Sequence, residues 1–251
     1  MWRDLHPKEL GHRFKIVDVH SHIGDYPAFN VSMTAESLIR EMKTFGIRRA
    51  VVFSYDNQAV AEAVKRYDEL LGMAWVNPRT ESTINFLRQN LKNPKFVGVK
   101  LHPLLDGYLP DDPIIHPIVE TARSVGWVIL IHCGHPPFTL PWSIEELVER
   151  FPDQRFILGH MGHGNIVYIN GTLAVARRRR NIYLEPSGMP MHTKIKEAIE
   201  AIGKERVLWG SDVPFHDLSV ELMKLQAAEL SEDEMRSVLG ENAERLFSVR
   251  D

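Results

Sequence analysis

The sequence predicts an α/β protein: a single (β/α)8 barrel domain of the TIM-barrel class, spanning residues 1–251, with an extra helix at its C-terminus. Short apolar runs rich in β-branched residues alternate with longer amphipathic segments along the whole chain. A chain of 251 residues has the usual length of such a barrel. The first apolar run ends in Asp18-Val19-His20-Ser21-His22 rather than in a glycine-rich phosphate turn, which argues against an open, doubly wound sheet.

The predicted strands are continuous apolar runs, as expected of parallel strands that are buried on both faces. Parallel neighbours need a crossover between them, and an amphipathic segment follows each run. In chain order, the strands are Phe14–Val19, Ala50–Phe53, Gly72–Val76, Phe96–Leu101, Trp127–Ile131, Arg155–Gly159, Asn181–Leu184 and Val207–Trp209.

The predicted helices are bounded by residues typical of helix ends. Ser143, followed by Glu146, is typical of a capping box, and Gly46, Gly126 and Gly203 each separate a helical pattern from a strand. The helices between the strands are Thr34–Phe45, Gln58–Leu70, Thr80–Leu91, Ile114–Val125, Ser143–Arg150, Asn165–Arg179, Lys194–Ile202 and Leu218–Leu230, and Ser231–Phe247 is expected to close the barrel.

Composition excludes several classes of protein. The chain has 30 Lys and Arg against 33 Asp and Glu, which gives no electrostatic basis for binding nucleic acid or an anionic membrane. No stretch approaches the ~20 apolar residues of a transmembrane helix, and Met1–Lys15 lacks the apolar core of a signal peptide. The lone Cys133 cannot form an internal disulfide, so a reducing, cytoplasmic location is expected.

Titratable side chains follow most of the predicted strands. His20 and His22 end the first strand, and Lys100 and His102 end the fourth. Because side chains alternate along a strand, the two members of each pair face the same side. The carboxyl ends of barrel strands meet at the rim that carries the active site in this fold. The same rim should receive Arg79, His132, His160 and Asp212.

These residues predict a metal site. His20, His22, His132 and Asp212 offer three imidazole nitrogens and one carboxylate, a set that suits Zn²⁺ with an open position for water. Asp212 would bind the metal, take a proton from the water, or do both. Lys100 is a salt-bridge partner, a ligand for an anionic substrate, or a carbamylated bridge between two metals. One divalent metal per chain is therefore expected, or two if Lys100 bridges them.

Six motifs follow one another along nearly the whole chain: Val17-Asp18-Val19-His20-Ser21-His22, Gly98-Val99-Lys100-Leu101-His102-Pro103, Ile131-His132-Cys133-Gly134, Gly159-His160-Met161-Gly162, Leu208-Trp209-Gly210-Ser211-Asp212 and Gly240–Phe247. Together they resemble the motifs of the amidohydrolase superfamily. The resemblance is greatest to the amidohydrolase-related branch that includes aminocarboxymuconate-semialdehyde decarboxylase.

The resemblance implies roles for individual residues. His20, His22, His132 and Asp212 match the ligands of a single metal. His160 matches a histidine that contacts the metal-bound water or the substrate when one metal is bound and binds the second metal when there are two. Lys100 matches the position of a carbamylated lysine in the members with two metals. A homodimer is a further expectation from the resemblance.

The leading functional hypothesis is metal-dependent hydrolysis of an amide, lactone or ester bond in a small molecule. The metal would polarise the reacting carbonyl and supply an activated water. Asp212 would accept a proton from that water and return it to the leaving group. His160 would stabilise the developing oxyanion or position the water.

Two alternatives stay open. The first is non-hydrolytic, metal-dependent decarboxylation of a small unsaturated or aromatic acid, with Lys100, Arg79 or His102 as a cationic clamp on the substrate. It would release carbon dioxide without taking up water. The second is a catalytically inactive barrel used for binding. The full ligand set argues against it, because buried imidazoles and carboxylates without a metal are costly.

Overall fold

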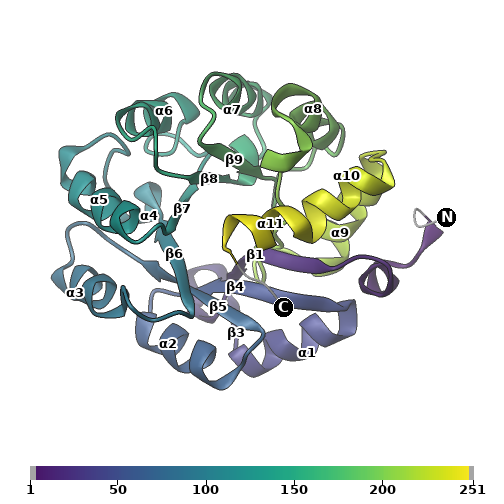
Figure 1. Cartoon of the computed structure of the whole chain (residues 1–251), viewed down its shortest axis with the longest axis horizontal. Coiled ribbons are helices and arrows are strands. Elements are labelled where there is room, and N and C mark those ends of the chain that lie inside the picture. The colour runs from purple at the N-terminus through teal and green to yellow at the C-terminus, as the bar shows by residue number, and fades with distance from the viewer. Residues whose placement is uncertain (1–3, 249–251) are drawn as a thin grey trace.

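The computed structural model describes residues 4–248 and has the predicted class of fold, a TIM-barrel-like arrangement of parallel strands and helices. Residues 1–3 and 249–251, the two ends of the predicted 1–251 domain, lie outside the described residues. Figure 1 shows the strands at the centre and the helices in a ring around them.

The central sheet has seven parallel strands in the order β1-β4-β5-β6-β7-β8-β9, which is their order along the chain. A separate antiparallel hairpin, β2–β3, follows β1 and was not predicted, because its strands are only three residues long and carry no apolar run. The strands are β1 (Ile16–His22), β2 (Gly24–Tyr26), β3 (Val31–Met33), β4 (Ile47–Phe53), β5 (Leu70–Trp75), β6 (Phe96–Leu101), β7 (Val128–His132), β8 (Phe156–Gly159) and β9 (Ile182–Glu185).

The predicted eighth strand, Val207–Trp209, is not a regular strand. The segment pairs with β9 and β1 at two isolated bridges, from Val207 to Leu184 and from Val213 to Ser21, rather than along a continuous ladder. The backbone N–H of Ser211 donates to the Asp18 carboxylate instead of to a neighbouring strand, which takes the segment out of a regular ladder. The bridges nevertheless join β9 to β1 and close the barrel.

Most helices lie close to their predicted ranges. The capping box expected at Ser143 is wrong: the helix begins two residues earlier, at Pro141, after the uncapped Leu140. The second predicted helix ends at Arg66, because Leu70 already belongs to β5. The helices are α1 (Ala35–Phe45), α2 (Asn57–Arg66), α3 (Glu81–Asn90), α4 (Pro103–Asp106), α5 (His116–Ser124), α6 (Pro141–Arg150), α7 (Ile166–Arg178), α8 (Thr193–Ile202), α9 (Leu218–Ala227), α10 (Glu232–Arg236) and α11 (Asn242–Leu246).

The core has two layers. One lies between the strands and the ring of helices, and the other fills the inside of the barrel with alternating strand side chains such as Val17 and Val19. Leu246 and Phe247 belong to this inner layer. Arg155, just before β8, donates to the Leu246 carbonyl, so the predicted closing helix covers the amino ends of the strands and leaves their carboxyl ends open.

Among residues 4–248, no helix combines the length and the apolar character that crossing a bilayer requires.

Candidate metal centre

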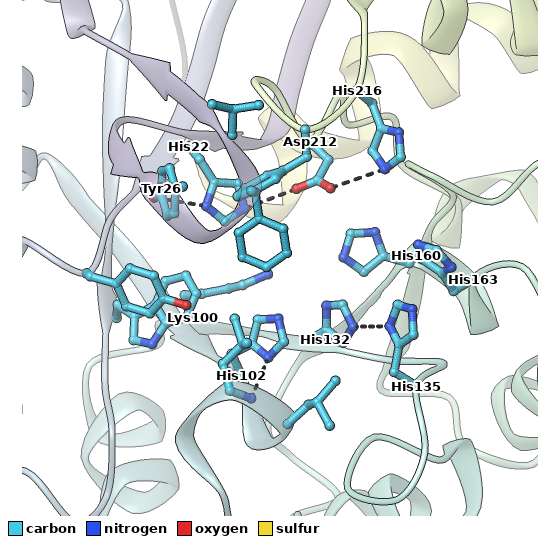
Figure 2. Close-up of a pocket in the computed structure, with 17 residues that line it drawn as sticks. His22, Tyr26, Lys100, His102, His132, His135, His160, His163, Asp212 and His216 are labelled. Carbon is cyan, nitrogen blue, oxygen red and sulfur yellow. Dashed lines mark hydrogen bonds and ion pairs between the residues drawn. The ribbon is translucent and has the colours of Figure 1, made fainter.

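A cavity of about 430 Å³ opens at the carboxyl ends of the strands, where the sequence placed the site (Figure 2). The predicted site residues that line it come from strands far apart along the chain: His22, Lys100, His102, His132, His160 and Asp212. His20 is fully buried next to them. Seven of the eight candidate side chains are therefore brought together by the fold.

Three buried donors converge at the base of the cavity. The Nε2 atoms of His20 and His22 lie 3.2 Å and 3.0 Å from the same oxygen, Oδ1 of Asp212. This group of one carboxylate and two imidazoles has the spacing of a site that could hold a metal ion. The period of two along β1 brings the two imidazoles to one side, as predicted.

Asp212 is positioned by a turn in the irregular closing segment. Its backbone adopts a left-handed conformation, with φ of 56°, and its N–H donates to the His20 carbonyl at 2.6 Å. Beneath it, the buried carboxylate of Asp18 accepts hydrogen bonds from the backbone N–H of both His20 and Ser211, each 3.0 Å long. Asp18 therefore connects β1, which carries His20 and His22, to the segment that carries Asp212.

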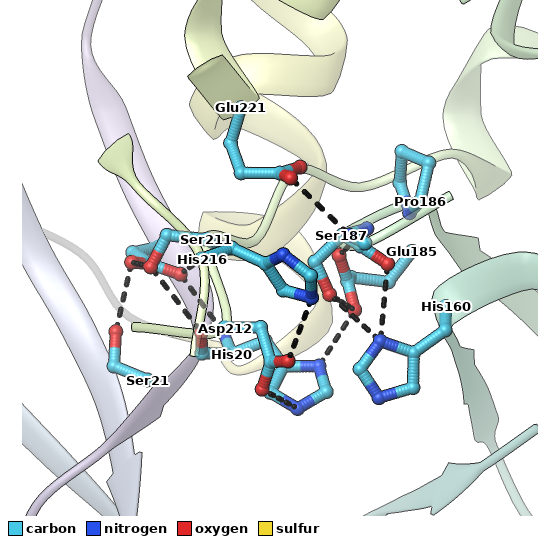
Figure 3. A network of polar contacts seen from close by, with 12 residues as sticks. His20, Ser21, His160, Glu185, Pro186, Ser187, Ser211, Asp212, His216 and Glu221 are labelled. Carbon is cyan, nitrogen blue, oxygen red and sulfur yellow. Dashed lines mark hydrogen bonds and ion pairs between the residues drawn. The ribbon is translucent and has the colours of Figure 1, made fainter. Parts of the chain in front are cut away.

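Glu185, at the end of β9, connects His20 to His160 (Figure 3). Its Oε2 lies 2.6 Å from Nδ1 of His20 and accepts the Ser187 hydroxyl at 2.9 Å. The Ser187 carbonyl in turn accepts from Nδ1 of His160 at 3.0 Å. Because both Nδ1 atoms are used as donors, both Nε2 atoms are left with a lone pair. His20, His160 and Glu185 also form a second close group of donors.

Burial and neighbouring charges set the protonation of the donors. Burial lowers the pKa of His22 to about 4, although Asp212 opposes this. Burial and Lys100 lower the pKa of His20, but Asp212 and Glu185 raise it more, so that the net pKa lies above the ordinary value. Burial by itself raises the pKa of Asp212, yet His20 and His160 hold it well below its usual range. The carboxylate is therefore ionised at neutral pH, as metal binding requires.

Lys100 brings a buried cation to the same place. Its Nζ lies 3.1 Å from Nε2 of His20, and burial lowers its pKa to about 8, against the opposing charges of Asp212 and Glu185. The geometry holds Lys100 close to the predicted ligands, as either a substrate-binding or a bridging role requires.

His132 and His102 lie farther along the cavity wall. The His132 Nε2 is 2.7 Å from Nδ1 of His135, and its ring stacks on His102 with centroids 4.0 Å apart. Neither residue belongs to the two close donor groups found among residues 4–248. Arg79 is exposed, donates to the Gly107 carbonyl and does not line the cavity in the described part of the chain.

The rest of the wall comes from strand ends and from the loops that follow them. Aromatic side chains line it on the side of the β2–β3 hairpin: Tyr26, Phe29, Tyr55, Trp75 and Phe215. His216 lies across the cavity, near His160 and His163 (Figure 2), with Nε2 3.5 Å from Oδ2 of Asp212. Its spacing of four residues from Asp212 is the one sequence signal that could have pointed to it, whereas the aromatic residues carry none.

Comparison with curated proteins gives relatives of two kinds. The chain is 24% identical over 268 residues to an uncharacterized metal-dependent hydrolase from Bacillus subtilis, covering 93% of this chain and 99% of that protein. It is 27% identical over 120 residues to a gamma-resorcylate decarboxylase from a Polaromonas species. That match covers 41% of this chain and only 37% of the decarboxylase.

Among solved structures, the fold is similar to that of 5-carboxyvanillate decarboxylase from Novosphingobium aromaticivorans, complexed with manganese and 4-hydroxy-3-methoxy-5-nitrobenzoic acid. The TM-score is 0.76 at 15% identity, over 99% of this chain and 100% of that chain. The sequence pattern of the amidohydrolase family matches residues 5–249. Because that match spans almost the whole barrel and every strand that carries a candidate ligand, the protein belongs to the amidohydrolase family.

Proposed function

We propose that the protein is a metal-dependent decarboxylase of a small aromatic carboxylic acid. The observation that carries this proposal is the cavity, in which an aromatic wall stands over buried metal donors and the buried cation of Lys100. A flat ring packs well against such a wall, and its carboxylate meets positive charge at the base. The likeness to two decarboxylases of aromatic acids supports the same choice. Decarboxylation, an alternative at the sequence level, thus moves ahead of hydrolysis.

The donor chemistry fits a divalent metal ion. Two imidazole nitrogens and one carboxylate oxygen converge, and among residues 4–248 no backbone N–H donates to any of these three atoms. When bound, the ion would supply positive charge that holds and polarises the substrate. We propose Mn²⁺ rather than the expected Zn²⁺, because the decarboxylase of similar fold contains manganese. His160 and His132 remain proposed as further ligands or substrate contacts.

The reaction breaks the bond between a ring carbon and the carboxylate, releases carbon dioxide and needs a proton at that carbon. We assign the proton to Asp212, whose two oxygens face different neighbours. Oδ1 faces His20 and His22, and Oδ2 lies 3.5 Å from Nε2 of His216. Oδ1 therefore serves the metal donors, and Oδ2, which is ionised at rest, can take a proton from His216 and pass it to the ring carbon. Lys100 would hold the substrate carboxylate before the bond breaks.

The test is carbon dioxide release by manganese-loaded protein from a panel of benzoic acids with hydroxyl, methoxyl and second carboxyl groups. We expect at least one acid to be turned over, and Asp212→Asn to lower its kcat by about 100-fold or more. Manganese content measured beside activity separates loss of the metal from loss of proton transfer. Absence of carbon dioxide from every acid, with the metal bound, would contradict the proposal.

Hydrolysis is the second candidate, because a relative that matches 93% of the chain is named as a metal-dependent hydrolase. In that reaction Asp212 would accept a proton from the attacking water. Incubation of the same loaded protein with lactones and aryl esters, followed by acid release in a pH-stat, tests it. Turnover of these substrates with no decarboxylation would reverse the order of the two candidates.

A further inference from the structure

The turn after β8 contains the most unusual backbone of the described chain. His160, Met161, Gly162 and His163 follow one another with positive φ angles of 66°, 46°, 92° and 54°. The combination at His163, φ of 54° and ψ of −138°, lies in a region that L-residues avoid and glycine adopts freely. A histidine at this position strains the backbone where a glycine would not.

The neighbouring loop holds this turn in place. A Cβ atom on Gly134, just after β7, would lie 2.3 Å from the Gly162 carbonyl carbon and 2.7 Å from the His163 nitrogen, so the two backbones touch. The His163 N–H also donates to the His160 carbonyl at 2.7 Å. These contacts fix the backbone but make no use of the imidazole. They therefore give no structural reason for an imidazole at position 163.

That imidazole lines the cavity. The ring centroids of His20 and His160 lie 4.8 Å apart, and those of His160 and His163 lie 5.6 Å apart. The imidazole of His163 therefore lies beyond that of His160, farther from the metal donors (Figure 2). Its ring is 4.1 Å from that of His135. Among residues 4–248, no hydrogen bond to either ring nitrogen of His163 is formed, which leaves an N–H free for a ligand.

The surrounding wall offers hydrogen-bond donors to a negative ligand at this place. Among the described lining residues Asp212 is the one carboxylate, and it faces His20 and His22. The Lys100 ammonium offsets its charge, and the imidazoles of the wall supply N–H donors. Of these imidazoles, His135, His163 and His216 lie on the side away from Lys100 (Figure 2). An acid held by its reacting carboxylate at the metal donors would reach this side with a substituent of its ring.

We propose that His163 is a specificity-determining residue that binds a second anionic group of the substrate, so that the preferred substrate is an aromatic dicarboxylic acid. The proposal rests on the proposed function only in taking an aromatic acid as the ligand. His163 donates its free N–H to the second carboxylate, and His135 lies beside it. A glycine at this position would relieve the backbone strain but would remove this donor.

The test compares wild type with His163→Gly, both loaded with manganese, by calorimetric titration with benzoate and with isophthalate. We expect wild type to bind isophthalate about tenfold more tightly than benzoate. His163→Gly should lose this preference while its affinity for benzoate stays within about twofold, because the reacting end is untouched. It should also unfold at a higher temperature, because glycine relieves the backbone strain. Removal of a merely structural side chain would instead lower the unfolding temperature.

Glu229→Gly is the matched control. Glu229 also has a positive φ, 55°, but is exposed and does not line the cavity, so this variant should keep the preference for isophthalate. The proposal would be overturned if wild type bound benzoate and isophthalate with equal affinity, or bound neither. It would also be overturned if His163→Gly kept the preference for isophthalate. An unchanged or lower unfolding temperature of His163→Gly would overturn it too.

A third acid tests the requirement for charge. 3-Hydroxybenzoate carries a neutral hydroxyl in place of the second carboxylate and should bind wild type like benzoate. Binding as tight as that of isophthalate would overturn the anionic assignment. Because all these readouts are binding and unfolding, a failure to decarboxylate any acid would contradict the proposed function and leave this test intact.

Discussion

The carboxylate of Glu185 fixes the orientation of two imidazoles, those of His20 and His160. It accepts from Nδ1 of His20 directly and binds Ser187, whose carbonyl accepts from His160. A fully buried carboxylate is costly to ionise, yet the contact with His20 and the donors of Ser187 hold the pKa of Glu185 below its ordinary value. The residue therefore orients the Nε2 lone pairs of two histidines toward the cavity without lining it.

Glu185→Gln is expected to weaken manganese binding by about 10–100-fold, because the amide cannot hold His20 in one orientation as a carboxylate does. The measurement is the Kd for Mn²⁺ by calorimetric titration. Glu120→Gln, at an exposed position on α5, is the matched control and should bind manganese like wild type. An unchanged Kd in Glu185→Gln would show that the contact with His20 is dispensable.

The convergence of His20, His22 and Asp212 could be predicted because side-chain direction along a strand follows a period of two. The same rule says nothing of loops. His216 reaches Asp212 only because the backbone turns through a positive φ at Asp212 itself, which no pattern in the sequence marks. Arg79 follows a strand and was expected at the rim, yet its side chain turns to the Gly107 carbonyl.

At the scale of elements, helix α9 holds the loop that carries Ser187. Its Glu221 accepts from the backbone N–H of Gly188 at 3.2 Å, and Lys224 donates to the carbonyls of Pro186 and Met189, each at 2.9 Å. The same two side chains form an ion pair of 2.6 Å within the helix. Helix α9 thereby fixes the position of the loop from the side opposite His160.

This contact gives the stability of the protein a pH dependence. Burial raises the pKa of Glu221 from 4.5 to about 7, against the opposing charge of Lys224. Because this pKa is raised by folding, the folded state binds more protons than the unfolded state between these two pH values. The contribution of the Glu221 carboxyl to the free energy of unfolding is therefore complete below pH 4.5 and is lost as the pH rises through 7. We expect the free energy of unfolding of wild type, relative to Glu221→Gln, to fall over this range by up to about 3 kcal/mol. Urea unfolding at several pH values measures it, and a flat difference would refute it.

Periodicity predicted nearly all the elements and failed where elements are short. The regular strands β4 to β9 were recognised because they are continuous apolar runs. The segment from Val207 has such a run too, but the Asp18 carboxylate competes for the Ser211 N–H and prevents a ladder. The β2–β3 hairpin pairs three residues with three, too few for any pattern to emerge.

At the scale of the whole molecule, the candidate ligands link the first strand of the barrel to its closing segment. An ion bound by His20, His22 and Asp212 would join two parts of the chain that the backbone connects without a regular strand ladder. A ligand that binds only the folded state stabilises it in proportion to the logarithm of its concentration. Metal binding should therefore raise the free energy of unfolding of the entire barrel.

We expect manganese at 100 times its Kd to add about 2.7 kcal/mol to the free energy of unfolding and to raise the unfolding temperature by about 5–10 °C. Differential scanning calorimetry with and without a chelator measures this shift. His20→Ala combined with His22→Ala should remove the shift, because two of the three close donors are lost. A shift of equal size in that double variant would place the stabilising metal elsewhere.

The irregular closing segment also determines when the site comes into being. During synthesis, His20 and His22 leave the ribosome before Asp212, which follows only after the strands β1 to β9 have been translated. Two imidazoles without the carboxylate, and without Glu185 to orient one of them, are a poor trap for a cation. The three close donors therefore come together only in a chain whose closing segment has reached β1, and metal loading follows closure of the barrel.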